Sequence, residues 1–181
     1  MAGSSVQLLL LTLAQALSSA GIEHALIGGL ALAPRGFPRG TRDVDFLIHE
    51  SAIDQVRTLM QARSAEPILE SEEFSSYMDS RVRVNFQHAR RPISQEMLAR
   101  ADSVAFAGVA IPVLQAEDLI GLKFQAYHNN PRRLQDHVDI QRLLQANWGK
   151  LDLDRVLGYF VLFDREKDFK RFLELAATED R

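Results

Sequence analysis

The spacing of hydrophobic and polar positions divides the chain into predicted helices and strands. Leucines at helical spacing predict a helix over residues 4–20, and short apolar runs predict strands at 24–27 and 43–49. In residues 81–87, apolar and polar side chains alternate strictly, which is typical of a half-buried strand. From residue 115 onward the pattern becomes helical, with further helices predicted from Pro131 and over the ranges 152–161 and 165–177.

These elements favour an α/β (α+β) fold with a mixed, strongly twisted sheet flanked by helices and a helical C-terminal portion. The sheet would contain residues 24–28, 43–49, 81–87 and a hairpin at 103–114. We expect two parts: a core over residues 1–115 and a helical portion over residues 116–181 that completes the cleft.

The composition fits a soluble globular protein of one domain, or one domain with a small helical appendage: 181 residues, 46% hydrophobic and 25% charged. The absence of cysteine excludes disulfides and thiolate chemistry, and a net charge of −3 gives no overall attraction to nucleic acid. No apolar stretch reaches the roughly 20 residues of a membrane helix, so we expect no membrane partner and, by default, a cytoplasmic location.

Two carboxylates stand out in the second predicted strand. Asp43 and Asp45 are two positions apart, so they project from the same face while Val44 and Phe46 point into the core. Neighbouring anions favour a cation between them, and oxygen ligands suit Mg²⁺ or Mn²⁺. The alternative is a solvated strand edge, which is the more common setting of an isolated Asp-x-Asp.

A glycine pair follows the first predicted strand and favours a metal site at Asp43 and Asp45 over a solvated strand edge. Gly28 and Gly29 let the backbone approach a phosphate group closely, and the helix that follows would offer free N–H groups. Arg39, Thr41 and Arg42 lie between the glycines and the carboxylates and add cationic and hydroxyl donors. A glycine turn that binds phosphates and a carboxylate pair that binds the metal bridging those phosphates serve the same chemistry.

This arrangement resembles the signature of the DNA polymerase beta-like nucleotidyltransferases. The resemblance rests on Gly28-Gly29, thirteen residues, and Asp43-Val-Asp45, with Arg39-Gly-Thr41 just ahead, and it covers roughly residues 5–145. Within that superfamily the sequence is most similar to the small bacterial minimal and abortive-infection-type nucleotidyltransferases, some of which are toxins of toxin–antitoxin pairs. The resemblance implies the nucleotidyltransferase fold, a nucleoside triphosphate (NTP) such as ATP as substrate, and Mg²⁺ or Mn²⁺ as cofactor.

The resemblance departs from the family at one position. The family places a third carboxylate on the strand at residues 81–87, where it helps hold the metal and is thought to take a proton from the attacking hydroxyl; this chain has Asn85. An amide oxygen can still ligate a metal, but it carries no charge and cannot act as a general base. Asp79, His88 or water remain candidates for activating the acceptor.

Further candidates lie in the helical portion. Lys123 shares the apolar face of its helix, where a lysine usually extends toward solvent or pairs with a carboxylate. The resemblance implies instead that Lys123 reaches the nucleotide phosphates, and that Asp139, or alternatively Asp136, contacts the lysine or the nucleotide. On spacing alone, Asp136 and Asp139 also fit a salt-bridged helix surface.

Three hypotheses follow from the sequence. The first is a Mg²⁺-dependent nucleotidyltransferase that acts on a hydroxyl of a protein, a tRNA end or a small molecule. The second, which Asn85 supports, is a catalytically impaired nucleotide-binding or partner-binding module. The third is a purely structural protein–protein adaptor built on the C-terminal helices, which predicts no nucleotide binding at all. A separate expectation is an antitoxin or oligomer partner bound through the C-terminal helices.

Overall fold

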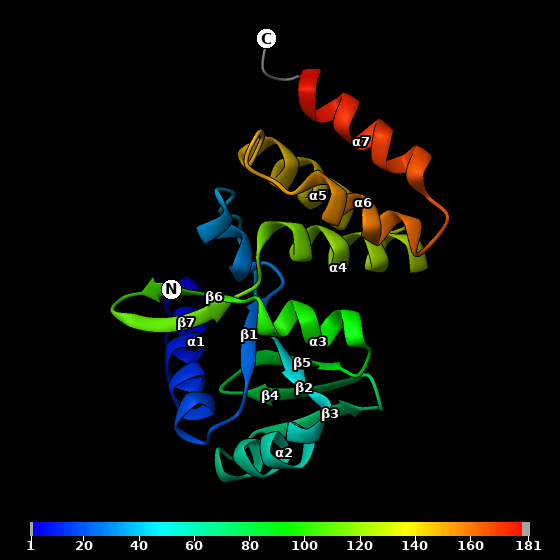
Figure 1. Ribbon diagram of the computed structural model, residues 1–181. Coiled ribbons are helices and arrows are strands. Elements are labelled where there is room, and N and C mark those ends of the chain that lie inside the picture. Colours follow the sequence, from blue (N-terminus) through cyan, green and yellow to red (C-terminus); the bar gives the residue numbers. More distant parts are fainter. Residues whose placement is uncertain (1, 179–181) are drawn as a thin grey trace. The chain divides into compact units, whose positions relative to one another are not determined.

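The computed structural model describes the backbone of residues 2–178 and the side chains of residues 5–177 (Figure 1). Helices and strands are intermixed up to residue 113, and all described elements after it are helices. In chain order the elements are α1 (Ala2–Ser19), β1 (His24–Ile27), the 3₁₀ helix η1 (Leu30–Arg35), β2 (Asp43–His49), the 3₁₀ helix η2 (Glu50–Ala52), α2 (Ile53–Ala62), β3 (Glu66–Glu70), β4 (Phe74–Asp79), β5 (Val82–Ala89), α3 (Pro92–Ala99), β6 (Asp102–Phe106), β7 (Val109–Val113), α4 (Ala116–Asn129), α5 (Leu134–Ala146), α6 (Leu153–Val161) and α7 (Glu166–Thr178).

The strands within residues 2–178 form one seven-stranded mixed sheet in the order β3-β4-β5-β2-β1-β7-β6. β1 runs antiparallel to β2 and parallel to β7, while β2 and β5 are parallel. The expected α/β fold with a mixed sheet is therefore confirmed. The sheet is wider than expected, because β3 and β4 join it as a meander that ends in β5.

A tight turn joins β4 to β5 and sets their register. Ser80 and Arg81 both have positive φ angles, 51° and 68°, which is the type I′ conformation that suits a two-residue hairpin. The sequence Asp79-Ser80 favours a turn at these two residues, whereas the structure places the turn one residue later, at Ser80-Arg81. Because the turn fixes Asp79 opposite Val82, it also places Ser76 opposite Asn85.

The central strands separate a buried face from a partly open one. On β2, Val44 and Phe46 are fully buried, whereas Asp43 and Asp45 on the other face are only half-buried. Phe46 stacks on Phe86 of β5 with 6.0 Å between ring centroids, so the aromatic core lies on the face opposite the carboxylates. Helix α1 packs on β2, β5 and β7 through its apolar side, and α3 packs on β2 and β5.

The chain divides into two compact units, which we describe separately. The first contains the residues up to Ala31 and Pro38–Leu114; the second contains Leu32–Phe37 and the chain from Gln115 onward. The predicted division into 1–115 and 116–181 places residues 32–37 in the first part. Asn147 explains their position in the second unit: its amide nitrogen donates to the carbonyl of Arg35 at 2.9 Å.

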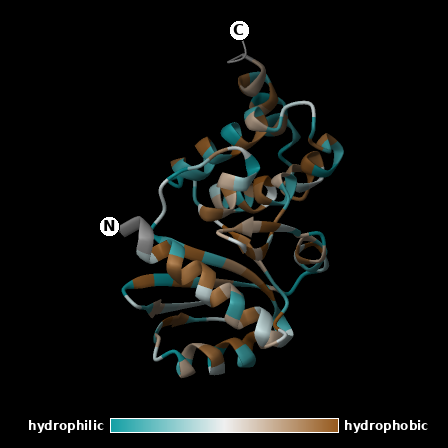
Figure 2. Cartoon of the chain, turned by 90° about the vertical axis from the view of Figure 1, so that its left-hand side faces the viewer, coloured by the Kyte–Doolittle hydropathy of each residue, from teal (hydrophilic) through white to brown (hydrophobic). Residues whose placement is uncertain are grey.

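Within the described part of the second unit, helices α4 to α7 form a cluster held by aromatic contacts. Phe124 of α4 stacks on Phe160 of α6 with 3.8 Å between centroids, and Phe160 also contacts Phe169 and Phe172 of α7. Hydrophobic and hydrophilic stretches alternate along these helices, as expected for elements buried on one side (Figure 2). Helix α5 begins at Leu134, later than the predicted start at Pro131.

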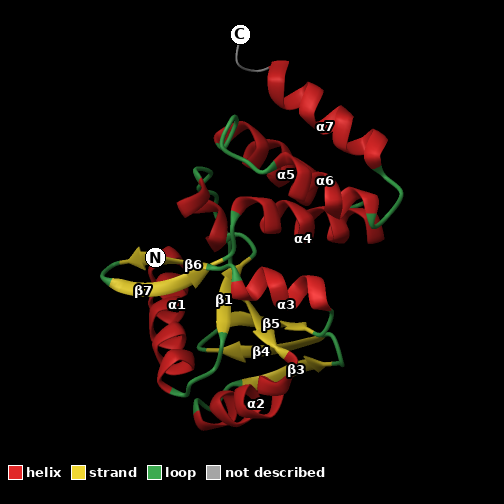
Figure 3. Cartoon of the chain, in the orientation of Figure 1, coloured by secondary structure: helices red, strands yellow, loops and turns green. Residues whose placement is uncertain are grey.

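No helix within residues 2–178 combines the length and the apolar content that crossing a membrane requires. Figure 3 shows that strands occur only in the first unit and that the described part of the second unit contains helices and loops alone. The expected helical C-terminal portion is therefore confirmed.

Close packing at Gly121 provides a test of the helical cluster. A β-carbon at Gly121 would lie 2.7 Å from the ring of Tyr159, which is itself buried. We expect Gly121→Ala to lower the free energy of unfolding by about 1–3 kcal/mol through overpacking. Chemical denaturation measures this change.

The matched control is Gly158→Ala on α6, where an added β-carbon meets no atom within 4 Å. This variant should be neutral or stabilising, by up to about 1 kcal/mol, because alanine favours the helix. Equal effects of the two substitutions would contradict the packing at Tyr159.

Candidate active site

The site in the first unit is built on the start of β2. Asp43 and Asp45 project from the same face of the sheet because Val44 between them points into the core. The register pairs Asp43 with Arg83 and Asp45 with Asn85 on the neighbouring strand β5. The carboxylates thus lie in two successive rows across the sheet, with an exposed arginine beside the first.

Gly28 sits directly against the second carboxylate. It has a φ angle of +67°, and a β-carbon added there would lie 2.0 Å from Oδ2 of Asp45. Only glycine avoids both the backbone strain and this clash. The close approach of β1 and Asp45 therefore explains the first glycine of the pair.

Gly29 accommodates the loop that precedes β2. A β-carbon at Gly29 would lie 2.8 Å from Cβ of Thr41 and 3.2 Å from Nη1 of Arg39. The hydroxyl of Thr41 accepts a long hydrogen bond, 3.4 Å, from the backbone nitrogen of Asp43. The structure thus brings together the glycines, Arg39, Thr41 and the two carboxylates.

Asn85 joins this group through its side chain. Its amide nitrogen donates to Oδ1 of Asp45 at 2.7 Å, and its amide oxygen accepts from the hydroxyl of Ser76 at 2.8 Å. The atom that a metal would need, the amide oxygen, is therefore turned to Ser76. Ser76 does not follow from the sequence pattern, because its place opposite Asn85 depends on the register that the β4–β5 turn sets.

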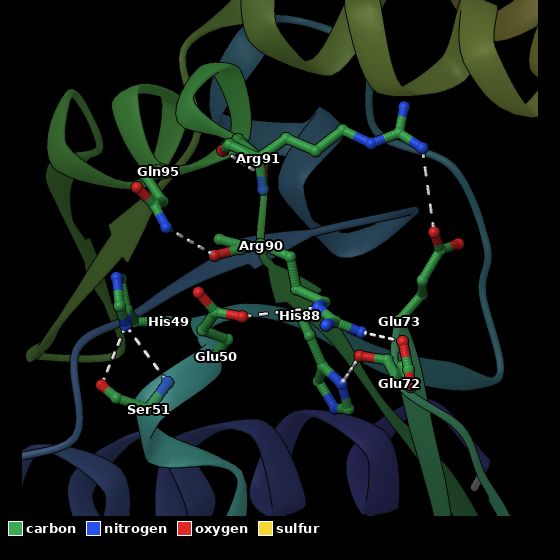
Figure 4. Close-up of polar contacts among 11 residues, drawn as sticks. His49, Glu50, Ser51, Glu72, Glu73, His88, Arg90, Arg91 and Gln95 are labelled. Carbon is green, nitrogen blue, oxygen red and sulfur yellow. Dashed lines mark hydrogen bonds and ion pairs between the residues drawn. The ribbon is translucent and has the colours of Figure 1, made fainter.

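Asp79 and His88, considered above as alternative bases, lie on the other face of the sheet. Asp79 is three residues from Ser76 along β4, so it points to the opposite side, where its Oδ2 pairs with Nε of Arg63 at 2.6 Å. His88 is likewise three residues from Asn85, and its ring bonds to the Ser75 hydroxyl. The ring also bonds to the carbonyl of Glu72 (Figure 4). Neither side chain reaches Asp45 from that face.

The donor set fits a hard divalent cation held by few protein ligands. Within the described residues, no three His, Cys, Asp or Glu side chains gather into a group that could hold a metal alone. Two carboxylates on one face suit Mg²⁺, which proteins commonly bind through one or two carboxylates together with substrate phosphates. Asp43 and Asp45 are the residues that would hold such an ion.

In the second unit, Lys123 is buried between two carboxylates. Its Nζ lies 2.9 Å from Oδ1 of Asp136 and 2.7 Å from Oδ2 of Asp139. Gln135 donates to Asp139 at 2.9 Å, and Arg133 pairs with the other oxygen of Asp136 at 2.5 Å. The charges of this cluster balance: two cationic side chains face two carboxylates.

The second unit also contains a surface hollow of about 150 Å³ that no sequence pattern indicated. The ring of His137 lies 4.7 Å from that of Phe172 and 5.2 Å from that of Tyr127. Burial, and then the charge of Arg171, lowers the pKa of His137. The hollow is lined by Tyr127, His137, Asp168, Arg171, Phe172 and Leu175.

The fold is that of known nucleotidyltransferases. The antibiotic-resistance factor ANT(2″)-Ia, in its solution structure, matches with a TM-score of 0.67 and 14% identity over 99% of each chain. The lincosamide adenylyltransferase LnuA with bound lincomycin matches with a TM-score of 0.54 and 11% identity, over 72% of this chain and 90% of that one. A putative nucleotidyltransferase from Thermotoga maritima matches with a TM-score of 0.51 and 18% identity, over 70% and 85% of the two chains.

The chain belongs to the family described as "Uncharacterised nucleotidyltransferase", whose model matches residues 2–178. A search of curated proteins by sequence finds no match. The predicted membership of the nucleotidyltransferases is therefore confirmed, whereas the minimal or abortive-infection subtype stays a prediction.

The contact of Gly28 with Asp45 gives a sharp test of the site geometry. We expect Gly28→Ala to destabilise the protein more than Gly21→Ala, although both glycines have nearly the same left-handed φ angle, +67° and +68°. Both variants suffer backbone strain of about 1 kcal/mol, but only the first collides with a carboxylate, since Gly21 has open space around it. Urea unfolding of the two variants measures the difference, and identical midpoints would contradict the contact.

The buried lysine provides a second test. Lys123→Met should lower the free energy of unfolding by about 3–5 kcal/mol, because it leaves Asp136 and Asp139 buried without the shared cation. Adding Asp139→Asn to this variant should restore part of the loss. The same denaturation assay measures both variants.

The control is Arg133→Met, which removes the other cation of the cluster. The Arg133 side chain is 55% exposed, so its pair with Asp136 should contribute less than about 1 kcal/mol. If Arg133→Met lowered the free energy of unfolding as much as Lys123→Met does, burial would not determine how much each ion pair of the cluster contributes to stability.

Proposed function

We propose that the protein is a divalent-metal-dependent nucleotidyltransferase that moves a nucleoside monophosphate from an NTP to a hydroxyl acceptor. The observation that carries this proposal is the pair Asp43 and Asp45, half-buried on one face of β2 with Gly28 against the second carboxylate. Family membership supplies the reaction class. In the reaction the acceptor oxygen forms a bond to the α-phosphorus, the bond to the β-phosphate breaks, and pyrophosphate leaves with the hydroxyl proton passing to solvent.

Each residue of the first unit has a role in this proposal. Asp43 and Asp45 hold Mg²⁺ or Mn²⁺, which when bound neutralises charge on the NTP phosphates. Gly28 and Gly29 allow the phosphates to approach the backbone after β1. Arg39 and Thr41, whose side chains lie against Gly29, supply a cation and a hydroxyl donor for the phosphate oxygens.

From the second unit we propose that Lys123 binds nucleotide phosphates and that Asp139 orients it. The ion pair between them, at 2.7 Å, supports the orienting role. A lysine has three N–H donors, and two of them face Asp136 and Asp139, so one is available for a phosphate oxygen.

For the acceptor we propose a small molecule first, ahead of a tRNA end or a protein. The likeness in fold and length to ANT(2″)-Ia, also solved with adenylyl-2″-tobramycin, makes hydroxylated antibiotics the natural probes. A toxin role with an antitoxin bound to the C-terminal helices is a separate proposal, which co-purification of a partner would test.

Asn85 favours a second candidate function, a module that binds NTP without transferring it. An amide at this position cannot remove a proton from the acceptor. Asp79 and His88, on the other face of the sheet, do not replace it at Asp45. This candidate predicts metal-dependent NTP binding without release of pyrophosphate.

The deciding experiment is label transfer. Purified protein, Mg²⁺ and each α-labelled NTP are incubated with tobramycin, lincomycin or a cell extract, in parallel with Asp43→Ala and Asp45→Ala. We expect label on an acceptor with the wild type and a loss of at least a hundredfold in both variants, because each removes half of the cation's carboxylate ligands.

The control variant is Asp54→Ala, an exposed aspartate of α2 paired with Arg57, which should keep full activity. Transfer that survives in the Asp43 and Asp45 variants would refute the proposed site. Binding of NTP and metal by calorimetry, with no label on any acceptor, would favour the binding module.

A further inference from the structure

A row of polar contacts crosses the sheet and meets at Asp45. The register sets Ser76 of β4 opposite Asn85 of β5, Asn85 opposite Asp45 of β2, and Asp45 opposite Ile27 at the end of β1. Residues directly opposite each other share a face of the sheet, so the three polar side chains point the same way. They are joined in sequence by hydrogen bonds of 2.8 and 2.7 Å.

The direction of these hydrogen bonds is fixed by chemistry. A carboxylate only accepts, so Asn85 must turn its amide nitrogen toward Asp45 and its oxygen away. The oxygen then needs a donor, and the hydroxyl of Ser76, which is 2% exposed, provides it. Ser76 thereby satisfies the amide oxygen in the orientation of Asn85 that donates to Asp45.

Asp45 is consequently held from two sides. Asn85 donates to Oδ1, and Gly28 lies against Oδ2 with no side chain of its own. Without a cation between them, a third carboxylate in place of Asn85 would face Asp45 at hydrogen-bond distance and repel it. The row therefore suits an amide at this position. Asn85 can orient Asp45 through its amide nitrogen without acting as a base or as a metal ligand.

We propose that Asn85 and Ser76 are positioning residues: Asn85 holds the Asp45 carboxylate in the orientation that binds the divalent cation, and Ser76 holds Asn85. This inference rests on the proposed metal site. It differs from the alternative in which the amide oxygen of Asn85 is itself a metal ligand, since that oxygen would first have to leave Ser76.

The test measures Mn²⁺ binding by calorimetry, with and without nonhydrolysable NTP analogues, in the wild type, Ser76→Ala and Ser76→Thr. If Asn85 acts through Asp45, Ser76→Ala should weaken Mn²⁺ binding about 10-fold or more, as loss of a partner behind a metal ligand generally does. Ser76→Thr keeps the hydroxyl and should restore most of the affinity. If the amide oxygen were a ligand, Ser76→Ala would release it and leave the affinity unchanged or higher, which would overturn the proposal.

Ser75→Ala is the matched control. Ser75 is the neighbouring serine on β4, is equally buried, and bonds to His88 on the opposite face. Thermal unfolding should show comparable stability losses for the two alanine variants, while only Ser76→Ala changes Mn²⁺ binding. Equal losses of Mn²⁺ affinity in both would reduce Ser76 to a structural role and overturn the proposal.

Asn85→Leu keeps the inference testable if Ser76→Ala does not fold, because it removes the donor at similar volume and should weaken Mn²⁺ binding about 10–100-fold. Wild-type protein that binds no more Mn²⁺ than Asp45→Ala would overturn the proposed metal site and this inference together. Wild-type binding that persists unchanged in Ser76→Ala and Asn85→Leu would overturn this inference alone.

Discussion

The candidate site depends on one constraint, the register of three strands around Asp45. β1 ends opposite Asp45, so that Gly28 meets the carboxylate as the chain turns away, and β5 presents Asn85 from the other side. A shift of one residue in either pairing would carry the whole set to the buried face. Phe46 and Phe86, stacked on that buried face, secure the register because their burial forbids such a shift.

The sequence predicted the central elements well because their hydrophobic periods are strong and regular. The strands at 43–49 and 81–87 follow from apolar side chains that fill one face, and the structure has β2 at Asp43–His49 and β5 at Val82–Ala89. β3 and its place in the sheet were harder to predict, since all residues of Glu66–Glu70 are exposed and no periodicity marks an outer strand. Likewise, the packing of residues 32–37 with the second unit depends on Asn147, more than a hundred positions away.

The sequence predicted the site residues that lie close together along the chain, but not those whose place depends on how the strands pair. Asp43, Asp45 and the glycines are close in sequence and share a recognisable spacing. The partner of Asn85 depends on where the β4–β5 turn falls, and two residues with positive φ, Ser80 and Arg81, moved it by one position. That single position decides whether Ser76 or Phe74 faces the amide, which is why Ser76 did not emerge from the sequence.

The key charged side chains of the two units have different partners. In the second unit, the buried carboxylates of Asp136 and Asp139 already pair with Lys123, so most of its positive charge is compensated within the cluster. In the first unit, Asp43 and Asp45 are half-buried, and the contact that Asp45 accepts from Asn85 is with a neutral amide, which adds no positive charge beside the carboxylate. A neutral donor orients a carboxylate and leaves its charge unchanged. An arginine or lysine in the same position would orient the carboxylate and also neutralise its charge. The amide at residue 85 is therefore compatible with a site that must attract a cation, even though it cannot serve that site as a base.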